Sequence, residues 1–247
     1  MRRRLTAKAS KRSSRSSTAP LLSRTATRSV FNFSSSPDLH DASMVVADLD
    51  QGGISMPDRD YYIKDDEKTK TVRQAYLTYL KKSFVLAGQS EAQAADSAQT
   101  VLNVETDLAK ASMDRTVRRD PAVHDHKMSL NDAAALAPNL QLVKFFKFAG
   151  VPSFTSLNVE NPEFFKQANG IFMKYPVDAW KTYLNWQMIN FAAPWLSDPF
   201  VQARSPDRRN SKRAGNAASI RPTTHLAKRS DSRTSIKPSA SKASSAC

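Results

Sequence analysis

Apolar residues recur at three- and four-residue intervals along two neighbouring stretches, and this spacing limits the chain to a fold built on paired helices. The first stretch begins at the acidic residues 65–67, which suit the positive end of a helix, and Gly88 closes it. The second begins at Ser90, which has Gln93 three residues later and so predicts a capping box. Because the connection is short, we expect two antiparallel helices.

The same spacing, together with capping residues and prolines, predicts further helices at residues 129–138, 142–150, 161–172 and 180–191. Two short strands are also expected, the β-branched run 44–48 and the segment 154–159, the latter at the edge of a sheet. Between them, Gly52, Gly53 and Pro57 predict a shaped loop. The predicted fold class is therefore mainly α, with one or two short strands.

The positive charge of the chain lies at its two ends. The formal net charge is +14, but residues 1–29 hold nine Lys or Arg and no acid, and residues 204–247 hold eleven against two acids. Residues 30–203 keep 17 basic and 21 acidic side chains, a net charge of −4. We therefore expect one domain at 30–203 between two disordered basic tails. Specific nucleic-acid recognition is not expected, and binding through the tails would be nonspecific and salt-sensitive.

Each tail also has a second interpretation. Residues 1–29 are rich in Arg and Ser and lack acids, a composition that also fits a mitochondrial transit peptide. At residue 204 the apolar period ends abruptly, and Ser, Arg, Lys and Ala dominate from there on. We hypothesise that 204–247 derive from a frameshifted or truncated gene, which sequencing of the encoding DNA would test.

Other features exclude several classes of protein. The only cysteine is Cys247, so an intrachain disulfide and a Cys-based metal site are excluded. No window reaches the ~20 apolar residues of a membrane span, and residues 1–29 lack the apolar stretch of a signal peptide. The sequence leaves the cellular location and the oligomeric state open.

Several motifs in the folded region carry a family resemblance. They are DLDQGGISMPDRDYY at 48–62, ETDLAKASMDRTVRRDP at 105–121, HKMSL at 126–130, FTSLNVENPEFF at 154–165 and WKTYLNW at 180–186. In this order, from Val30 to Ala203, they resemble the N-terminal part of the neprilysin and endothelin-converting-enzyme family of zinc metallopeptidases, especially its bacterial oligopeptidase members. The resemblance implies a helical capping domain that restricts the substrate cavity to peptides. It also implies a complete enzyme that is exported or membrane-anchored and cleaves on the amino side of large hydrophobic residues.

The chemistry of that family is missing from the 247 residues. A zincin needs two histidines one helical turn apart with an intervening glutamate, the HExxH motif. None of the four histidines, His40, His124, His126 and His225, is followed by Glu, and the ExxxD pattern of the third ligand is absent. We predict no catalytic residues, no zinc in this chain, and peptide substrates only in a complete enzyme. His124 and His126 could chelate a metal with Asp125, although a structural role is favoured.

Five charged residues are expected to make fixed polar contacts: Arg59, Asp60, Arg118, Arg119 and Asp120. Arginines in RRDP would end a helix where cations complement its dipole. Alternatively, the loop around residues 52–59 faces the substrate cavity of a complete enzyme. Some relatives carry an arginine near Gly53 that helps hold substrate, whereas this chain has glycine.

Two functions follow from these patterns. The first is an inactive fragment of the substrate-restricting cap, whose apolar residues Phe191, Trp195, Leu196 and Phe200 would lack partner helices and make it prone to aggregation. The alternative is a basic-tailed helical protein that binds an acidic partner, nucleic acid or anionic membrane. Deletion of residues 1–29 and 204–247 distinguishes the two.

Overall fold

In the computed structural model, which describes residues 30–204, the two predicted antiparallel helices are α3 (Glu67–Leu86) and α4 (Glu91–Ala111). Asp66 caps α3 by accepting a hydrogen bond from the backbone of Thr69. Ser90 and Gln93 form both halves of the predicted capping box at the start of α4. Gly88 has a φ of 98°, a conformation that L side chains rarely adopt, and this permits the tight turn between the helices. These local predictions are confirmed.

The later helices also follow the predicted order. They are α5 (Leu130–Leu136), α6 (Leu142–Ala149), α7 (Pro162–Lys174) and α8 (Val177–Ala192). The short α2 (Asp60–Ile63) and α9 (Asp198–Arg204) were not predicted, and four 3₁₀ turns within the described residues join the longer elements: η1 (Val117–Arg119), η2 (Pro121–His124), η3 (Pro138–Leu140) and η4 (Ala193–Trp195). The prediction of a mainly helical fold is confirmed.

The described residues form one small sheet with the strand order β1-β2-β4-β3. Its strands are β1 (Phe31–Pro37), β2 (Val45–Gln51), β3 (Lys127–Ser129) and β4 (Ser156–Val159). The β1–β2 and β3–β4 pairs are antiparallel, whereas β2 and β4 run parallel. The sheet therefore has four strands, more than the one or two expected.

The expected edge position of segment 154–159 was wrong. Strand β4 lies inside the sheet, between β2 and β3, and pairs Leu157 with Ala47 across a long stretch of chain. Its neighbours come from sequence-distant segments, and local apolar spacing carries no information about them. The strands that flank β4 are therefore set by the tertiary fold and cannot be predicted from the sequence of β4 alone.

Strand β1 escaped prediction because its sequence FNFSSSP is rich in serine. Its alternating phenylalanines explain why it forms. Phe31 packs edge-on against Phe145, with ring centroids 5.1 Å apart, and Phe33 lies 4.7 Å from Phe146. Both partner rings belong to α6, so the strand is held by a helix on one face of the sheet.

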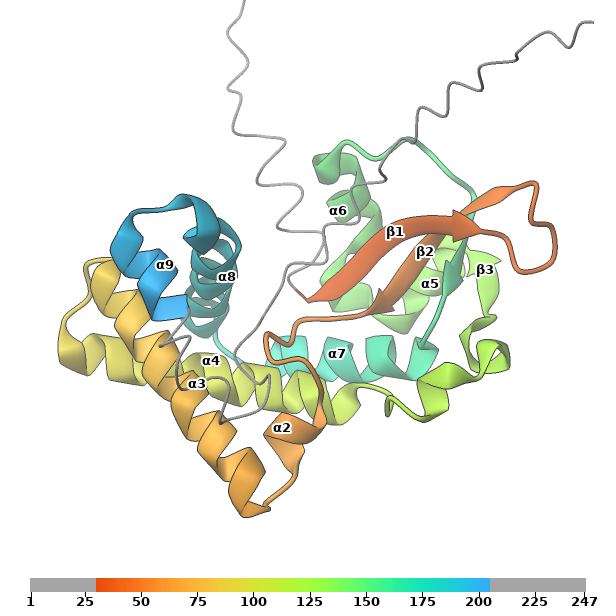
Figure 1. Cartoon of the computed structure of the whole chain (residues 1–247). Helices are drawn as coiled ribbons and strands as arrows, with labels where there is room; N and C mark the ends of the chain where they lie inside the picture. Colours follow the sequence, from red (N-terminus) through yellow and green to blue (C-terminus); the bar gives the residue numbers. More distant parts are fainter. Residues whose placement is uncertain (1–29, 205–247) are drawn as a thin grey trace, which may run out of the picture.

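Figure 1 shows how these elements are arranged. Helices α3, α4, α8 and α9 lie together on one side of the molecule, and the sheet lies with α5 and α6 on the other. Helix α7 runs below the sheet and contacts α4. The predicted disordered tails, the transit-peptide interpretation and the frameshift hypothesis concern residues 1–29 and 204–247. All of these except Arg204, the last residue of α9, lie outside the described residues.

Candidate functional site

The segment between β2 and α2, residues 52–59, is the β2–α2 loop, and its two glycines are required by its path. A Cβ on Gly52 would lie 2.9 Å from the backbone carbonyl carbon of Phe31, closer than real contacts allow. Gly53 has a φ of 82°, in the region that favours glycine. The chain can therefore turn sharply out of the sheet while staying packed against β1.

Three buried aromatic side chains hold this loop, two through its backbone and one through the Ser55 side chain. The hydroxyl of Tyr62 accepts hydrogen bonds from the backbone N–H groups of Ser55 and Met56, at 3.1 and 2.8 Å. The hydroxyl of Tyr183 donates to the carbonyl of Gly53 at 2.8 Å. The indole N–H of Trp186 donates to the Ser55 hydroxyl at 3.0 Å. The two tyrosine hydroxyls satisfy backbone groups that a buried loop would otherwise leave unpaired.

Glu105 of α4 lies at the centre of the same network and is fully buried. Its Oε1 accepts from the hydroxyl of Ser55 at 2.6 Å, and its Oε2 accepts from the hydroxyls of Tyr62 and Tyr76, both at 2.7 Å. The amide of Gln187 is 3.4 Å from Oε1. Burial raises the pKa of Glu105 to about 7, and the hydroxyl hydrogen bonds oppose that rise.

Both ends of the β2–α2 loop are tied to the segment that follows α4. The side-chain amide of Gln51 accepts from the backbone N–H of Met113 at 2.6 Å and donates to its carbonyl at 3.3 Å. Its Oε1 also accepts from Asn161 at 2.8 Å. At the other end, Arg59 donates to the carbonyl of Ser112. The Nε of Arg59 is buried without a hydrogen bond in the described part of the chain.

Within residues 30–204 the loop mainly serves to connect and stabilise the elements around it. Its Gly53, Ser55 and Met56 are buried, and Pro57 is the exposed residue at its apex. The backbone therefore offers little surface to a ligand in this part of the protein. A fixed conformation of this loop matters for the stability of the domain, because the loop joins the sheet to α3, α4 and α8.

A second polar cluster surrounds Arg118, a residue of η1 that lies beside the end of β2. Arg118 is 2.7 Å from the carboxylate of Asp50 and 3.4 Å from that of Glu160. His124 lies 3.0 Å from Glu160 through Nδ1, and its Nε2 is 2.8 Å from the Arg118 carbonyl. Burial raises the pKa of Glu160 to about 8, supported by a hydrogen bond with Asp48 and the charge of Asp50. Burial also raises the pKa of Asp50 against the pull of Arg118.

The five predicted polar residues do not converge on one site. Arg118 joins the cluster just described, and Arg59 bonds to the carbonyl after α4. Asp60 pairs with Lys64 at 2.6 Å on the surface. Asp120 caps η2, whereas Arg119 is exposed. The RRDP arginines lie in the last turn of the short 3₁₀ helix η1, whereas α4 already stops at Ala111.

Sequence reasoning missed Glu105, although a signal was present. The buried face of α4 includes Ala98, Val101, Leu102 and Leu108. Glu105 falls on this stripe at helical spacing, so a charged residue was placed among apolar ones. Such a position indicates a buried carboxyl that needs hydrogen-bond donors.

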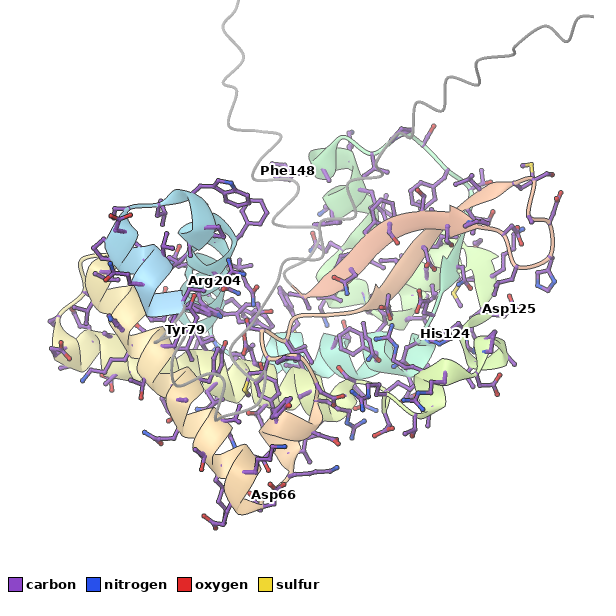
Figure 2. The ribbon with its side chains drawn as sticks, viewed as in Figure 1. Asp66, Tyr79, His124, Asp125, Phe148 and Arg204 are labelled. Atoms are coloured by element: carbon purple, nitrogen blue, oxygen red, sulfur yellow. The ribbon has the colours of Figure 1, made fainter. Side chains whose placement is uncertain are left out.

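The described residues do not fit a catalytic zinc ion. No group of three or more His, Asp, Glu or Cys side chains between residues 30 and 204 is arranged to hold a metal. His40 pairs with Asp125 at 2.8 Å, and His126 uses its backbone N–H to bind Asn158. Figure 2 shows His124 and Asp125 at the sheet end of the molecule, and His225 lies outside the described residues.

The apolar residues expected to lack partners lie near the end of the described chain. Trp195 and Leu196 are 66% and 42% exposed, and Phe191 contacts Trp195 with ring centroids 5.4 Å apart. Phe200 is half-buried.

None of the helices between residues 30 and 204 has both the length and the apolar composition needed to cross a bilayer.

Comparison with known proteins gives consistent matches. Residues 3–222 match the family described as peptidase family M13. Neprilysin-3 of Drosophila melanogaster is 29% identical over 185 residues, which are 70% of this chain and 24% of that protein. Endothelin-converting enzyme 1 of Homo sapiens is 26% identical over 175 residues, covering 68% of this chain and 22% of that protein.

Solved structures show the same likeness. The Mycobacterium tuberculosis zinc metalloprotease Zmp1 in complex with an inhibitor is 25% identical, with a TM-score of 0.68, over 75% of this chain and 29% of that one. PepO from Lactobacillus rhamnosis HN001 shares the fold at 18% identity, with a TM-score of 0.62, over 76% of this chain and 30% of that one. The chain spans about a quarter of the length of the curated relatives it matches.

Proposed function

Since this chain belongs to peptidase family M13, as its motifs predicted, we propose that it forms part of the substrate-restricting helical cap of a zinc metalloendopeptidase and cannot hydrolyse peptides alone. The observation that carries the proposal is a mismatch between fold and chemistry. The fold matches 29% of the solved Zmp1 chain, yet HExxH occurs nowhere in the 247 residues.

The chemical argument concerns what peptide hydrolysis requires. In zincins, a bound zinc ion activates water while a glutamate next to the histidine ligands takes its proton. The described residues offer no comparable ligand set, so we derive no catalytic step through them. The side chains of this chain instead build a packed unit, in which Glu105, Tyr62 and Tyr183 hydrogen-bond to one another or to the β2–α2 loop between the sheet and the helices. A wall of a restricted substrate cavity needs such a defined shape.

The loop itself supports a modest substrate role. Where some relatives are expected to present an arginine near position 53, this chain has a buried glycine. We propose that the loop supplies shape to the cavity in a complete enzyme and does not supply a charged contact to the substrate.

The purified 247-residue chain provides the first test. We expect no cleavage of a fluorogenic peptide with a large hydrophobic residue after the scissile bond, with or without added Zn²⁺, while Zmp1 in the same buffer cleaves it. Chelator-sensitive hydrolysis that co-purifies with this chain and disappears from a mock purification would overturn the inactive assignment.

A chimera tests the cap assignment directly. Residues 30–204 would replace the matched segment of Zmp1, and zinc content and circular dichroism would establish that the product is folded. We expect chelator-sensitive cleavage of short peptides. A folded, zinc-loaded chimera that cleaves an unfolded protein as fast as a short peptide, unlike Zmp1, would contradict a cap role.

The concentration of basic residues in the tails favours a second candidate, a protein that binds acidic partners through them. Residues 1–29 hold nine Lys or Arg without an acid. Binding to heparin or RNA should then weaken steeply with salt, and it should disappear when both tails are deleted. Binding that survives in the 30–203 fragment would assign it to the domain.

A further inference from the structure

Glu105 combines complete burial with the absence of a cationic partner. It is 0% exposed, and none of the ion pairs between residues 30 and 204 includes it. Its hydrogen-bond partners are neutral hydroxyls and an amide. Burial of a carboxylate without a cation favours the protonated acid.

The hydrogen bonds favour the opposite form. Four donors point at the two oxygens of Glu105, from Ser55, Tyr62, Tyr76 and Gln187. Bonds from neutral donors to a charged acceptor are stronger than those to a neutral one. Burial is the larger of the two effects, and it raises the pKa of Glu105 to about 7 against the opposing hydrogen bonds.

The donors can adapt to a proton on Glu105 because one of them is free to reverse. Tyr62 cannot reverse, since its oxygen already accepts from two backbone N–H groups. The hydroxyl of Tyr76 donates to Glu105 and also interacts with the Ser55 hydroxyl, but no backbone N–H of the described residues fixes its direction, so its oxygen can turn to accept the new proton. Both protonation states are therefore compatible with the closed network.

The β2–α2 loop is one wall of this site. Ser55 bonds directly to Glu105, and Tyr62 bonds both to Glu105 and to the loop backbone. If the loop moves away, water reaches the carboxyl and removes the cost of burying its charge. Opening therefore becomes easier when the carboxylate forms and harder when the acid forms.

We propose that Glu105 is a pH-sensitive lock on the β2–α2 loop, which is held most firmly when Glu105 carries a proton and loosens when the carboxylate forms. The titratable groups facing Glu105 are Tyr62 on α2, Tyr76 on α3 and Tyr183 on α8. Burial and the charge of Glu105 raise the pKa of each of them, so all three stay protonated across the range concerned. The lock concerns this domain alone and does not depend on the proposed cap function.

Amide hydrogen exchange of the full 247-residue chain tests the lock. The protection factors of the Ser55 and Met56 amides, which bond to Tyr62, would be compared between pH 5.5 and 8.5 after correction for intrinsic exchange. We expect at least about tenfold lower protection at pH 8.5, the effect of roughly one pKa unit of linkage. The side-chain carboxyl ¹³C signal of Glu105 should titrate near neutral pH.

Three variants separate the lock from a merely structural role. Glu105→Gln mimics the protonated acid, so it should keep the loop protected at pH 8.5 and remove the transition. Glu91→Gln alters an exposed glutamate of the same helix and should leave the transition intact. Tyr76→Phe removes a donor to the carboxylate, so the titration midpoint of Glu105 should move to higher pH.

The proposal is overturned if loop protection does not change between pH 5.5 and 8.5. It is also overturned if the transition persists in Glu105→Gln, or if the Glu105 signal titrates below pH 5.5 with the exposed glutamates. Should Glu105→Gln fail to fold, the direction of the midpoint shift in Tyr76→Phe decides the question.

Discussion

The hydroxyl of Tyr62 should contribute more to stability than that of its neighbour Tyr61, and the substitution Tyr62→Phe measures the difference. The change removes one oxygen and keeps the ring, which is 1% exposed. It leaves the backbone N–H groups of Ser55 and Met56 without their acceptor and removes one donor from Glu105. The backbone of the β2–α2 loop thereby keeps only one of its two tyrosine partners, Tyr183.

The magnitude follows from the unpaired groups. A buried donor that loses its partner costs about 1–3 kcal/mol. Two such donors set a range of roughly 2–6 kcal/mol, and relaxation of the loop toward water reduces it. We expect Tyr62→Phe to lower the free energy of unfolding by about 3 kcal/mol at pH 7.

Urea unfolding of the full chain, followed by near-ultraviolet circular dichroism, gives the free energy by linear extrapolation. Tyr61→Phe is the matched control, because Tyr61 is half-buried and its hydroxyl makes no hydrogen bond within residues 30–204. It should change stability by less than about 0.5 kcal/mol. If the two variants agree within that margin with equal urea dependence, the anchoring role assigned to Tyr62 is wrong.

Three further outcomes are expected. Gly52→Ala should lower the urea midpoint, because the new Cβ would collide with the backbone of Phe31. Gly170 has open space around it within α7, so Gly170→Ala should raise the free energy of unfolding by about 0.5–1 kcal/mol. A shift of both urea midpoints in the same direction would contradict this. The pKa of Glu160 rises from 4.5 to about 8, mainly through burial, so the folded state holds a proton that the unfolded state has released, and stability falls as pH rises through that window. Glu160→Gln should therefore flatten the fall between pH 7 and 8, and an unchanged slope in urea midpoints would refute it. Trp195, which is 66% exposed, should promote association; light scattering should decrease in Trp195→Ser, and equal scattering would remove Trp195 as a cause.

Helix positions could be read from the sequence because their signals are local. The Ser90–Gln93 capping box and the Asn161 cap lie within one helical turn of the groups they satisfy. Gly88 likewise ends its helix through its own backbone conformation. Strand β1 was missed because its serines resemble a loop, and only packing against α6 shows why Phe31 and Phe33 belong in a strand.

The polar network was less predictable from the sequence. The sequence predicts a fixed polar contact for Arg118, but its partners Asp50 and Glu160 lie 68 and 42 residues away in the chain. Glu105 occurs in a motif that was recognised, yet its partners Ser55, Tyr62 and Tyr76 come from three other segments. Spacing along the chain cannot predict which donors meet a given carboxyl.

The sequence by itself determined the longer helices, the family and the absence of an HExxH motif from these residues, because each depends on side chains close together in the chain. The tertiary structure alone decided the strand order, the burial of Glu105 and the closure of the β2–α2 loop around it. These features depend on which segments, far apart in the sequence, pack against one another and exclude water between them. Burial is a property of the packed chain, and the proton affinity of Glu105 follows from it.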